Sequence, residues 1–196
     1  MSDDAPSLIL ASTSRYRRDL LARLGVPFIA AAPDCDEDAY KTGKISPQEL
    51  AETLALRKAE SLLAAHPDAA ILGGDQVASI DDEILSKPGS EAAARVQLTR
   101  LAGRTHTLIT AVALLARGRV LRHTDVTRLT MRPLSAEQIA RYVAADRPLD
   151  CGGSYRLESL GIALFSRIES ADHTAIVGLP LLALTTMLGE IGIVIP

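Results

Sequence analysis

Residues 8–14 read Leu8-Ile9-Leu10-Ala11-Ser12-Thr13-Ser14, a short apolar run followed at once by three hydroxyl side chains. Four consecutive apolar residues bounded by a turn signal predict a short buried strand. Beyond the hydroxyl residues, Leu20, Leu21 and Leu24 recur at helical spacing before Gly25 ends the pattern. The chain is therefore expected to begin as strand, turn and helix, the unit from which α/β folds are built.

Further along, apolar runs and helix-start signals alternate in the same way. Two capping boxes, at Ser46 and at Ser135, each predict the first turn of a helix. The expected helices are 47–65, one from Ser90 to Gly103, 136–145 and one from Pro180, and the expected strands are 28–32, 69–72, 105–115, 120–134 and 175–177. Strand 69–72 should run parallel to strand 8–11, and 105–134 should form a hairpin. We predict an α/β fold with a mixed twisted sheet flanked by helices, in one domain over residues 1–196.

Composition narrows the classes of function. Of the 196 residues, 47% are hydrophobic and 23% charged, as in a globular domain, and the net charge of −3 provides no general attraction for nucleic acid. The start, with Asp3 and Asp4, lacks the pattern of a secretory signal, and no apolar run is long enough to span a membrane. Cys35 and Cys151 lie far apart without metal-ligand spacing. These features favour a cytoplasmic protein without nucleic-acid or membrane partners.

The turn after the first strand is a candidate phosphate site. Free backbone N–H groups at a helix start, the hydroxyls of Ser12 and Ser14, and the guanidinium groups of Arg15, Arg17 and Arg18 are suited to binding phosphate. The alternative is that Ser14 only caps the helix and the arginines form a solvated face. The residues of this segment leave both interpretations open.

Carboxylates gather in two further places. Asp75 follows Gly73-Gly74 at the end of strand 69–72, where α/β folds bind ligands, so it can hold a metal or accept a proton. Alternatively, Asp75 forms a turn. A second group, Asp34, Asp36, Glu37 and Asp38, offers oxygen ligands for Mg²⁺ or Mn²⁺, or else is a solvated loop.

Other polar residues carry little signal on their own. Lys58 and Lys87 are isolated lysines, and the four histidines lack metal-type or triad spacing. No Gly-x-Gly-x-x-Gly or Walker-type loop is present, which argues against a dinucleotide oxidoreductase or a P-loop kinase.

Six stretches in register resemble the Maf family of nucleoside triphosphate pyrophosphatases along nearly the whole chain. They are residues 8–14 with Arg17, Asp36-Glu37, Arg57-Lys58-Ala59, Gly73-x-Asp75-Gln76, Lys87-Pro88, and Val177-Gly178-Leu179-Pro180-Leu181. The resemblance implies two lobes with a central cleft, an assembly that is often a homodimer, and hydrolysis of a nucleoside triphosphate to monophosphate and pyrophosphate with a divalent metal. Carried over by position, it implies that Asp75 is the proton acceptor and a metal ligand and that Glu37 also faces the metal. It further implies phosphate binding by Ser12, Arg17, Lys58 and Lys87, to which Ser14 is added from the turn.

Within the family, the pattern is similar to the subgroup that acts on 7-methyl-GTP. Tyr16, Gln76 and Glu158 match positions at which that subgroup has an aromatic residue, Gln and Glu. The chain departs from it in having Tyr16 where Trp is common, Arg15 where Pro is usual and Gly74 where Ser is usual. Two alternatives remain, a dTTP/UTP pyrophosphatase of the same family and a non-catalytic nucleotide sensor acting on cell division.

Overall fold

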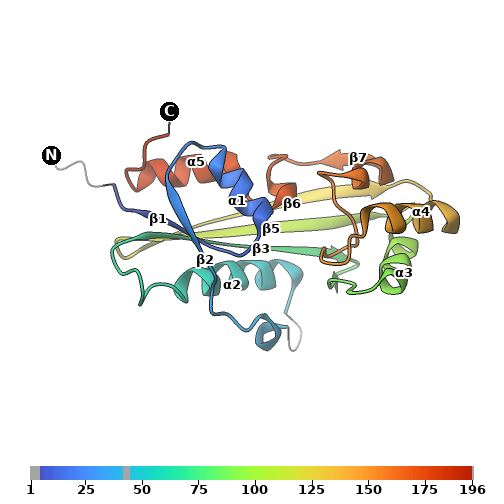
Figure 1. Cartoon of the computed structure of the whole chain (residues 1–196), viewed down its shortest axis with the longest axis horizontal. Helices are drawn as coiled ribbons and strands as arrows, with labels where there is room; N and C mark the ends of the chain where they lie inside the picture. Colours follow the sequence, from blue (N-terminus) through green and yellow to red (C-terminus); the bar gives the residue numbers. More distant parts are fainter. Residues whose placement is uncertain (1–4, 42–44, 196) are drawn as a thin grey trace. The chain divides into compact units, whose positions relative to one another are not determined.

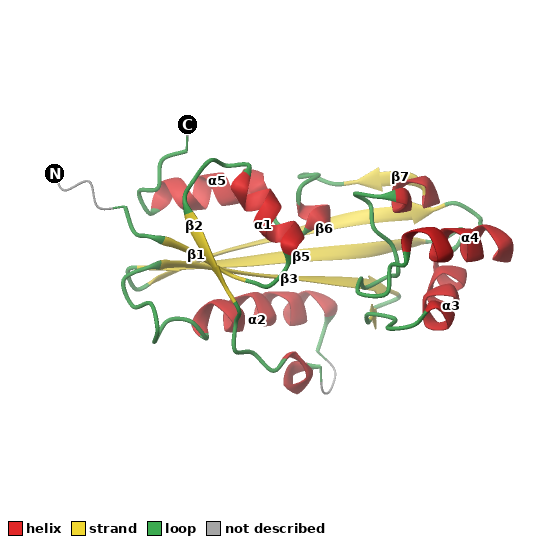
Figure 2. Ribbon diagram, viewed as in Figure 1, coloured by secondary structure: helices red, strands yellow, loops and turns green. Residues whose placement is uncertain are grey.

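The computed structural model describes residues 5–41 and 45–195, so the acidic start at Asp3 and Asp4 lies outside the described residues. Figures 1 and 2 show the helices and strands. The helices are α1 (Arg15–Ala22), α2 (Pro47–Glu60), α3 (Glu91–Leu101), α4 (Ala136–Asp146) and α5 (Leu181–Glu190), with 3-10 turns η1 (Glu37–Tyr40), η2 (Leu160–Leu164) and η3 (Ala175–Val177). The strands are β1 (Leu8–Ala11), β2 (Phe28–Ala31), β3 (Ala70–Ile80), β4 (Glu83–Leu85), β5 (Thr105–Ala116), β6 (Arg119–Met131) and β7 (Phe165–Glu169).

The strands form one sheet of seven strands, and its mixed character is as the sequence predicts. Its order is β2-β1-β3-β5-β6-β7, with β4 paired to β3. β1 is parallel to both β2 and β3, whereas β4 and β7 pair antiparallel to β3 and β6. A two-residue turn at Arg117 and Gly118, both with positive φ, joins β5 to β6, the geometry preferred in tight hairpins. The predicted α/β class and the predicted parallel pairing of strand 69–72 with strand 8–11 are confirmed.

The chain divides into two compact units. The first comprises Met1–Gln76, Thr110–Asp125 and Asp172–Pro196, and the second comprises Val77–Ile109 and Val126–Ala171. In the first unit the sheet lies between helices, with α1 and α5 on one face and α2 on the other (Figure 2). Alternation along β1 explains this arrangement, because Leu8 and Leu10 pack with α1 and α5 while Ile9 and Ala11 pack with α2.

Strand β3 is longer than predicted, because Gly73 and Gly74 continue the strand instead of ending it. A Cβ atom at Gly73 would lie 2.0 Å from the carbonyl oxygen of Ala55 and 2.8 Å from the backbone nitrogen of Ala59, both in α2. Glycine is thus required here for close helix–strand approach. Asp75 consequently lies inside β3 and is not a turn residue, so that alternative is wrong.

The second unit has its own core. Leu98 and Leu101 of α3 and Ile139 and Val143 of α4 are buried, and α3 contacts α4. A cluster of rings adjoins them, in which His106 of β5 lies 5.4 Å from Tyr155 and 5.9 Å from Phe165, measured between ring centroids. Leu129, Met131, Tyr142 and Leu164 are also buried in this unit. The unit therefore stabilises itself by apolar packing.

Two predicted elements differ from the structure. Segment 175–177 is the 3-10 turn η3 and not a strand, because its backbone groups are bonded within the 174–178 loop and to side chains of β3 and β5. Helix α2 ends at Glu60, five residues before the predicted end, and residues 61–65 form turns. The strands β4 and β7 were not predicted, since both are short and lack a clear alternation.

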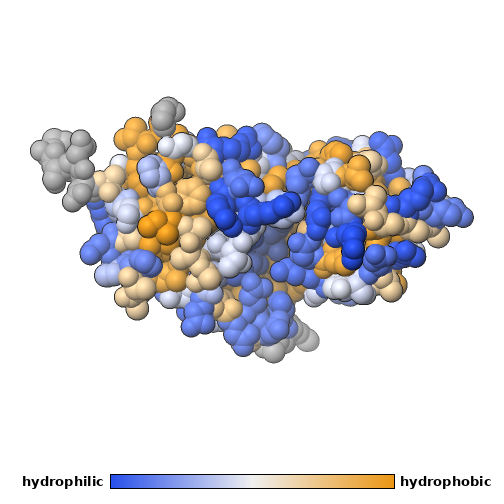
Figure 3. All heavy atoms as spheres, viewed as in Figure 1, coloured by the Kyte–Doolittle hydropathy of each residue, from blue (hydrophilic) through white to orange (hydrophobic). Residues whose placement is uncertain are grey.

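Figure 3 shows apolar surface over the part of the first unit that carries α5. Exposed apolar side chains of the first unit include Leu182 of α5, Val194 and, on the edge strand β2, Ile29. Scattered residues of this kind are normal on a protein surface. In the part of the chain that the structure describes, no helix combines the length and the apolar character needed to cross a membrane.

Candidate active site

Lys58 of α2 lies at the centre of a cluster of charged side chains in the first unit. Its Nζ is 2.6 Å from Oδ1 of Asp75 and 2.7 Å from Oε1 of Glu37. The side chains of Lys58 and Asp75 are only 8% and 10% exposed, whereas that of Glu37 is 40% exposed. Poor access of water strengthens the attraction between these charges. Three residues predicted from separate segments are thus brought together by α2, β3 and η1.

The turn after β1 lies next to this cluster in the sheet. Ala11, the last residue of β1, pairs with Gly73 of the adjacent strand β3. The turn that begins at Ser12 therefore starts beside the part of β3 that leads to Asp75, two residues after Gly73. The Oγ of Ser12 accepts a hydrogen bond from the N–H of Ser14 at 3.1 Å. The Oγ of Ser14 accepts from the N–H of Arg17 at 3.4 Å, which makes Ser14 the N-cap of α1. The capping interpretation of Ser14 is confirmed, and its phosphate role stays a prediction.

The side chain of Arg17 lies close to the backbone of Gly178 and of Gly74. Its Nε donates to the carbonyl oxygen of Gly178 at 3.1 Å. A Cβ atom at Gly178 would lie 3.2 Å from Cγ of Arg17, and one at Gly74 would lie 3.6 Å from its Nε. Desolvation lowers the pKa of the Arg17 guanidinium, and the charges of Asp75 and Glu37 oppose that shift. The guanidinium is therefore within range of electrostatic attraction to both carboxylates.

Gln76 follows Asp75 in β3, and its amide is fixed by the loop around η3. Its Nε2 lies 2.9 Å from Oγ1 of Thr110, 2.9 Å from the carbonyl oxygen of Ala175 and 3.1 Å from that of Ile176. Oγ1 of Thr110 itself donates to Ala175 at 2.8 Å. The amide nitrogen is thus engaged inside the first unit.

Tyr16 lies in the first turn of α1 and is partly covered by its neighbour. The guanidinium carbon of Arg15 is 4.8 Å from the centroid of the Tyr16 ring. A guanidinium at this distance over an aromatic face is attracted to it. The sequence predicts Tyr16 as a contact for a nucleobase, and the chain's own cation occupies one face of that ring.

The predicted carboxylate group around residue 36 separates in the structure. Asp36 caps η1 by accepting from the N–H of Asp38 at 3.1 Å, and Asp38 pairs with Lys41 at 2.8 Å. The N–H of Asp34 bonds Oγ of Ser61. Glu37 is the member of this group that reaches Lys58. Asp34, Asp36 and Asp38 are exposed, which agrees with the solvated-loop interpretation, and a metal role for them stays a prediction. Glu37 belongs to the charged cluster.

Glu37 and Asp75 are compatible with a magnesium or manganese ion. Both are carboxylates, the oxygen ligands that these hard cations prefer, and they converge on the same Nζ of Lys58. Among residues 5–41 and 45–195, no group of three or more His, Cys, Asp or Glu side chains is arranged to hold a metal. Mg²⁺ is often bound by one or two carboxylates together with substrate phosphates. The residues thus fit an ion that is held jointly with a phosphorylated ligand.

Two predicted residues belong to the second unit. Lys87 is exposed in the segment between β4 and α3, and Glu158 is exposed in the segment between α4 and η2. The segment around Glu158 is held by Asp146, whose Oδ2 accepts from the hydroxyl of Tyr142 at 2.8 Å and whose Oδ1 accepts from Ser159 at 2.7 Å. Both residues are open to solvent within their own unit.

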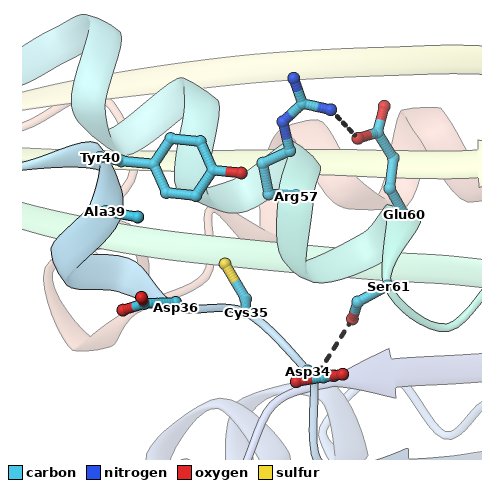
Figure 4. A pocket seen from close by; sticks show the side chains of 8 residues that line it. All are labelled: Asp34, Cys35, Asp36, Ala39, Tyr40, Arg57, Glu60 and Ser61. Atoms are coloured by element: carbon cyan, nitrogen blue, oxygen red, sulfur yellow. Dashed lines mark hydrogen bonds and ion pairs between the residues drawn. The ribbon is translucent and has the colours of Figure 1, made fainter.

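A cavity of about 340 Å³ lies in the first unit between the loop before η1, η1 itself and the end of α2 (Figure 4). Its lining consists of Asp34, Cys35, Asp36, Ala39, Tyr40, Arg57, Glu60 and Ser61. Desolvation raises the pKa of the Cys35 thiol, although the positive charge of Lys58 opposes the shift. A thiol in this state is a weak nucleophile. Neither Lys58 nor Asp75 lines the cavity.

Comparison with known proteins identifies the family. Residues 7–191 match the family model described as Maf-like protein. The chain belongs to the Maf family. The stretches that resemble the family carry Ser12, Arg17, Glu37, Lys58 and Asp75, of which Glu37 and Asp75 both contact Lys58.

Several similar proteins are named 7-methyl-GTP pyrophosphatase. One from Xanthomonas axonopodis pv. citri is 47% identical over 191 residues, covering 97% of this chain and all of the relative. Another from Bdellovibrio bacteriovorus is 47% identical, covering 92% of this chain and 95% of the relative. A third, from Aromatoleum aromaticum, is 47% identical and covers 96% and 97%.

The sequence prediction missed two contributors to the site. The Maf stretch at residues 177–181 was recognised without a role for its glycine, and the structure shows that the Gly178 carbonyl binds Arg17. Thr110, which holds both Gln76 and Ala175, carries no sequence signal, since threonine is ordinary in a strand. The backbone of Gly178 has a φ of +130°, a conformation that residues other than glycine rarely adopt.

Proposed function

We propose that this chain is a nucleotide pyrophosphatase that hydrolyses 7-methyl-GTP between its α and β phosphates, giving 7-methyl-GMP and pyrophosphate. The observation that carries the proposal is the buried Lys58 bonded to both Asp75 and Glu37, beside the turn of Ser12. The names of the relatives at 46–47% identity support the substrate.

Asp75 is proposed as the proton acceptor. In the reaction, a bond forms between the oxygen of water and the α-phosphorus, and the bond from that phosphorus to the bridging oxygen of the leaving pyrophosphate breaks. The Nζ of Lys58 donates to Oδ1 of Asp75, which keeps the carboxylate in one orientation and leaves Oδ2 for the proton of water. A positioned base of this kind contributes about 10²–10⁴ in rate.

A divalent cation, proposed to be Mg²⁺ or Mn²⁺, would be held by Glu37 and Asp75. When bound, such an ion neutralises phosphate charge and stabilises the leaving pyrophosphate. Lys58 also limits the repulsion between the two carboxylates before any cation is bound, because its ammonium lies within 2.7 Å of both.

Phosphate binding is proposed for the hydroxyls of Ser12 and Ser14, for Lys58 and for Arg17. In Arg17 the Nε is bonded to Gly178, and within residues 5–41 and 45–195 its terminal nitrogens have no hydrogen-bond partner. Guanidinium groups bind phosphate through such a pair of nitrogens. Lys87 is proposed as a further phosphate ligand on the family motif alone.

Selection of the base is proposed for Tyr16 and Glu158. Methylation at N7 makes guanine cationic, and a tyrosine ring attracts a cation by roughly 0.5–2 kcal/mol. A carboxylate such as Glu158 can accept from the ring N1–H and the exocyclic amine of guanine together. Uracil and thymine offer one such donor.

The test is product analysis with the purified full chain. Each of 7-methyl-GTP, GTP, dTTP and UTP is incubated with Mg²⁺ or Mn²⁺ in ¹⁸O-labelled water, and products are identified by phosphorus NMR and mass spectrometry. The proposal expects equal amounts of pyrophosphate and monophosphate from 7-methyl-GTP, with the label on the monophosphate. Release of inorganic phosphate and a diphosphate would overturn the cleavage position. No hydrolysis of any nucleotide would instead favour a nucleotide sensor.

A further inference from the structure

The groups around the Gln76 side chain determine which end of its amide can face them. Its Nε2 faces two backbone carbonyls, those of Ala175 and Ile176, and the hydroxyl oxygen of Thr110. The proton of that hydroxyl is already donated to Ala175. All three neighbours are therefore acceptors, and only the NH₂ end of the amide can face them.

These bonds fix the loop that holds Arg17. Gln76 and Thr110 converge on Ala175 and Ile176 of η3, and the loop continues within two residues to Gly178. The carbonyl oxygen of Gly178 accepts from Nε of Arg17 at 3.1 Å. A continuous set of hydrogen bonds thus leads from β3 and β5 through η3 to the guanidinium.

The space around Arg17 makes its position sensitive to that loop. Gly178 approaches the side chain so closely that a Cβ atom there would lie 3.2 Å from Cγ and 3.4 Å from Nε. A Cβ atom at Gly74 would lie 3.6 Å from Nε of the same side chain. A shift of η3 would move the acceptor of Nε and alter the direction of the terminal nitrogens.

We propose that Gln76, acting with Thr110, is a positioning residue that sets the direction of the Arg17 guanidinium toward phosphate. Gln76 then contributes equally to every triphosphate and does not distinguish one base from another. This inference rests on the proposed function, because it takes Arg17 as a phosphate ligand. It replaces the part in base selection that the family resemblance implies for Gln76.

The test compares Gln76→Met, which keeps side-chain length and removes the amide, with Thr110→Val and its conservative partner Thr110→Ser. Binding of inorganic triphosphate, measured by calorimetry with Mg²⁺, reports the phosphate site without a base and without turnover. We expect Gln76→Met and Thr110→Val to weaken triphosphate binding by about tenfold, since small misplacements of binding groups have large effects. Thr110→Ser should restore binding, and Gln48→Met, which changes an exposed amide on α2, should match the wild type.

A double-mutant cycle with Arg17→Ala decides whether Gln76 acts through Arg17. In the Arg17→Ala background, Gln76→Met should change triphosphate binding by less than about twofold, because coupled residues are not additive. Thermal unfolding of each variant identifies any that fail to fold, and the Thr110 pair tests the inference if Gln76→Met is one of them.

The results that would contradict this inference differ from those that would contradict the proposed function. If Gln76→Met leaves triphosphate binding intact and changes the ratio of kcat/KM for 7-methyl-GTP over GTP, Gln76 contacts the base and the inference is wrong. It is also wrong if the full effect of Gln76→Met persists without Arg17. Absence of nucleotide hydrolysis by the wild type would remove the proposed function, while triphosphate binding would still test the inference.

Discussion

Lys58 shares one ammonium group between two carboxylates with different surroundings. The side chain of Asp75 is 10% exposed and that of Glu37 is 40% exposed. A buried carboxylate meets less competing water, whereas an exposed one can be reached by a cation that arrives with a substrate. This division supports Asp75 as the proton acceptor and Glu37 as a ligand on the metal side.

The first prediction concerns Asp75→Asn, which keeps the size of the side chain and removes its negative charge. We expect kcat for 7-methyl-GTP to fall by about 10²–10⁴, the usual effect of losing a general base. The melting temperature should change little, because Lys58 keeps its bond to Glu37. Asp68→Asn, at an exposed turn, is the matched control. Retention of more than about a tenth of wild-type kcat would exclude Asp75 as the base.

The second prediction compares two glycines that lie close to Arg17. In Gly74→Ala the new Cβ would have its nearest neighbours at 3.4 Å and 3.6 Å, which is ordinary contact, so kcat/KM should stay within about threefold. In Gly178→Ala the new Cβ would lie 3.2 Å from Arg17 at a φ of +130°, so kcat/KM should fall by more than about tenfold. Equal effects of the two changes would show that the space around Arg17 does not matter.

At the scale of helices and strands, the sequence predicts a helix start correctly where a side chain hydrogen-bonds to backbone only a few residues away. Both capping boxes, at Ser46 and Ser135, and the N-cap at Ser90 were predicted and are present. Errors occurred where a distant contact decides the conformation. Gly73 continues β3 because α2 packs against it. Segment 175–177 is a turn because Gln76 and Thr110 bind its carbonyls.

The same distinction applies to the candidate site. The residues of the charged cluster were found from family motifs and from their chemical type, and their convergence on Lys58 was not visible in any single segment. The part of Gly178 depends on a contact across 161 positions of sequence. Periodicity reports local structure and cannot reveal such a pairing.

The third prediction concerns His106 of β5, which is buried beside Tyr155. Its Nε2 is 2.9 Å from the Tyr155 hydroxyl, and its Nδ1 has no partner among the described residues. Burial lowers the pKa of His106 from 6.5 to about 4. The unfolded chain therefore takes up a proton below pH 6.5 while the folded protein does not, so stability is full above pH 6.5 and falls as the pH drops toward 4.

Urea unfolding at pH 7.5 and pH 5 measures this effect. From the depressed pKa, the wild type should lose about 2 kcal/mol of unfolding free energy from His106 over that interval. His106→Gln removes the titrating group and should show a pH dependence that is smaller by about that amount. An unchanged pH dependence in the variant would mean that His106 becomes protonated in the folded protein.

At the scale of the whole molecule, each of the two compact units has its own buried residues, and the charged cluster belongs to the first unit alone. Lys87 and Glu158 belong to the second. The central cleft implied by the family resemblance stays a prediction, as does the single domain over residues 1–196. Substitutions made in each unit separately can test whether activity depends on residues from both units.

The fourth prediction is that hydrolysis requires a hard divalent cation. Glu37 and Asp75 offer carboxylate oxygens, and the triphosphate itself binds such cations. Excess EDTA should abolish pyrophosphate release, and added Mg²⁺ or Mn²⁺ should restore it. Glu37→Gln should raise the concentration of Mg²⁺ needed for half-maximal rate. Full activity in EDTA would leave Arg17 and Lys58 as the groups that neutralise the phosphate charge.

The most direct test of the proposed activity is kcat/KM of the wild-type chain for 7-methyl-GTP, GTP, dTTP and UTP under one set of conditions. We predict that 7-methyl-GTP is preferred by roughly 30-fold to a few thousand-fold, from a cation–π term and a charge-assisted hydrogen bond. The lower end is expected, because Arg15 already lies 4.8 Å from the centre of the Tyr16 ring. Tyr16→Ala and Glu158→Gln should each reduce the preference. A wild type that favours dTTP or UTP, or variants that leave the ranking unchanged, would contradict the assignment of 7-methyl-GTP as the substrate.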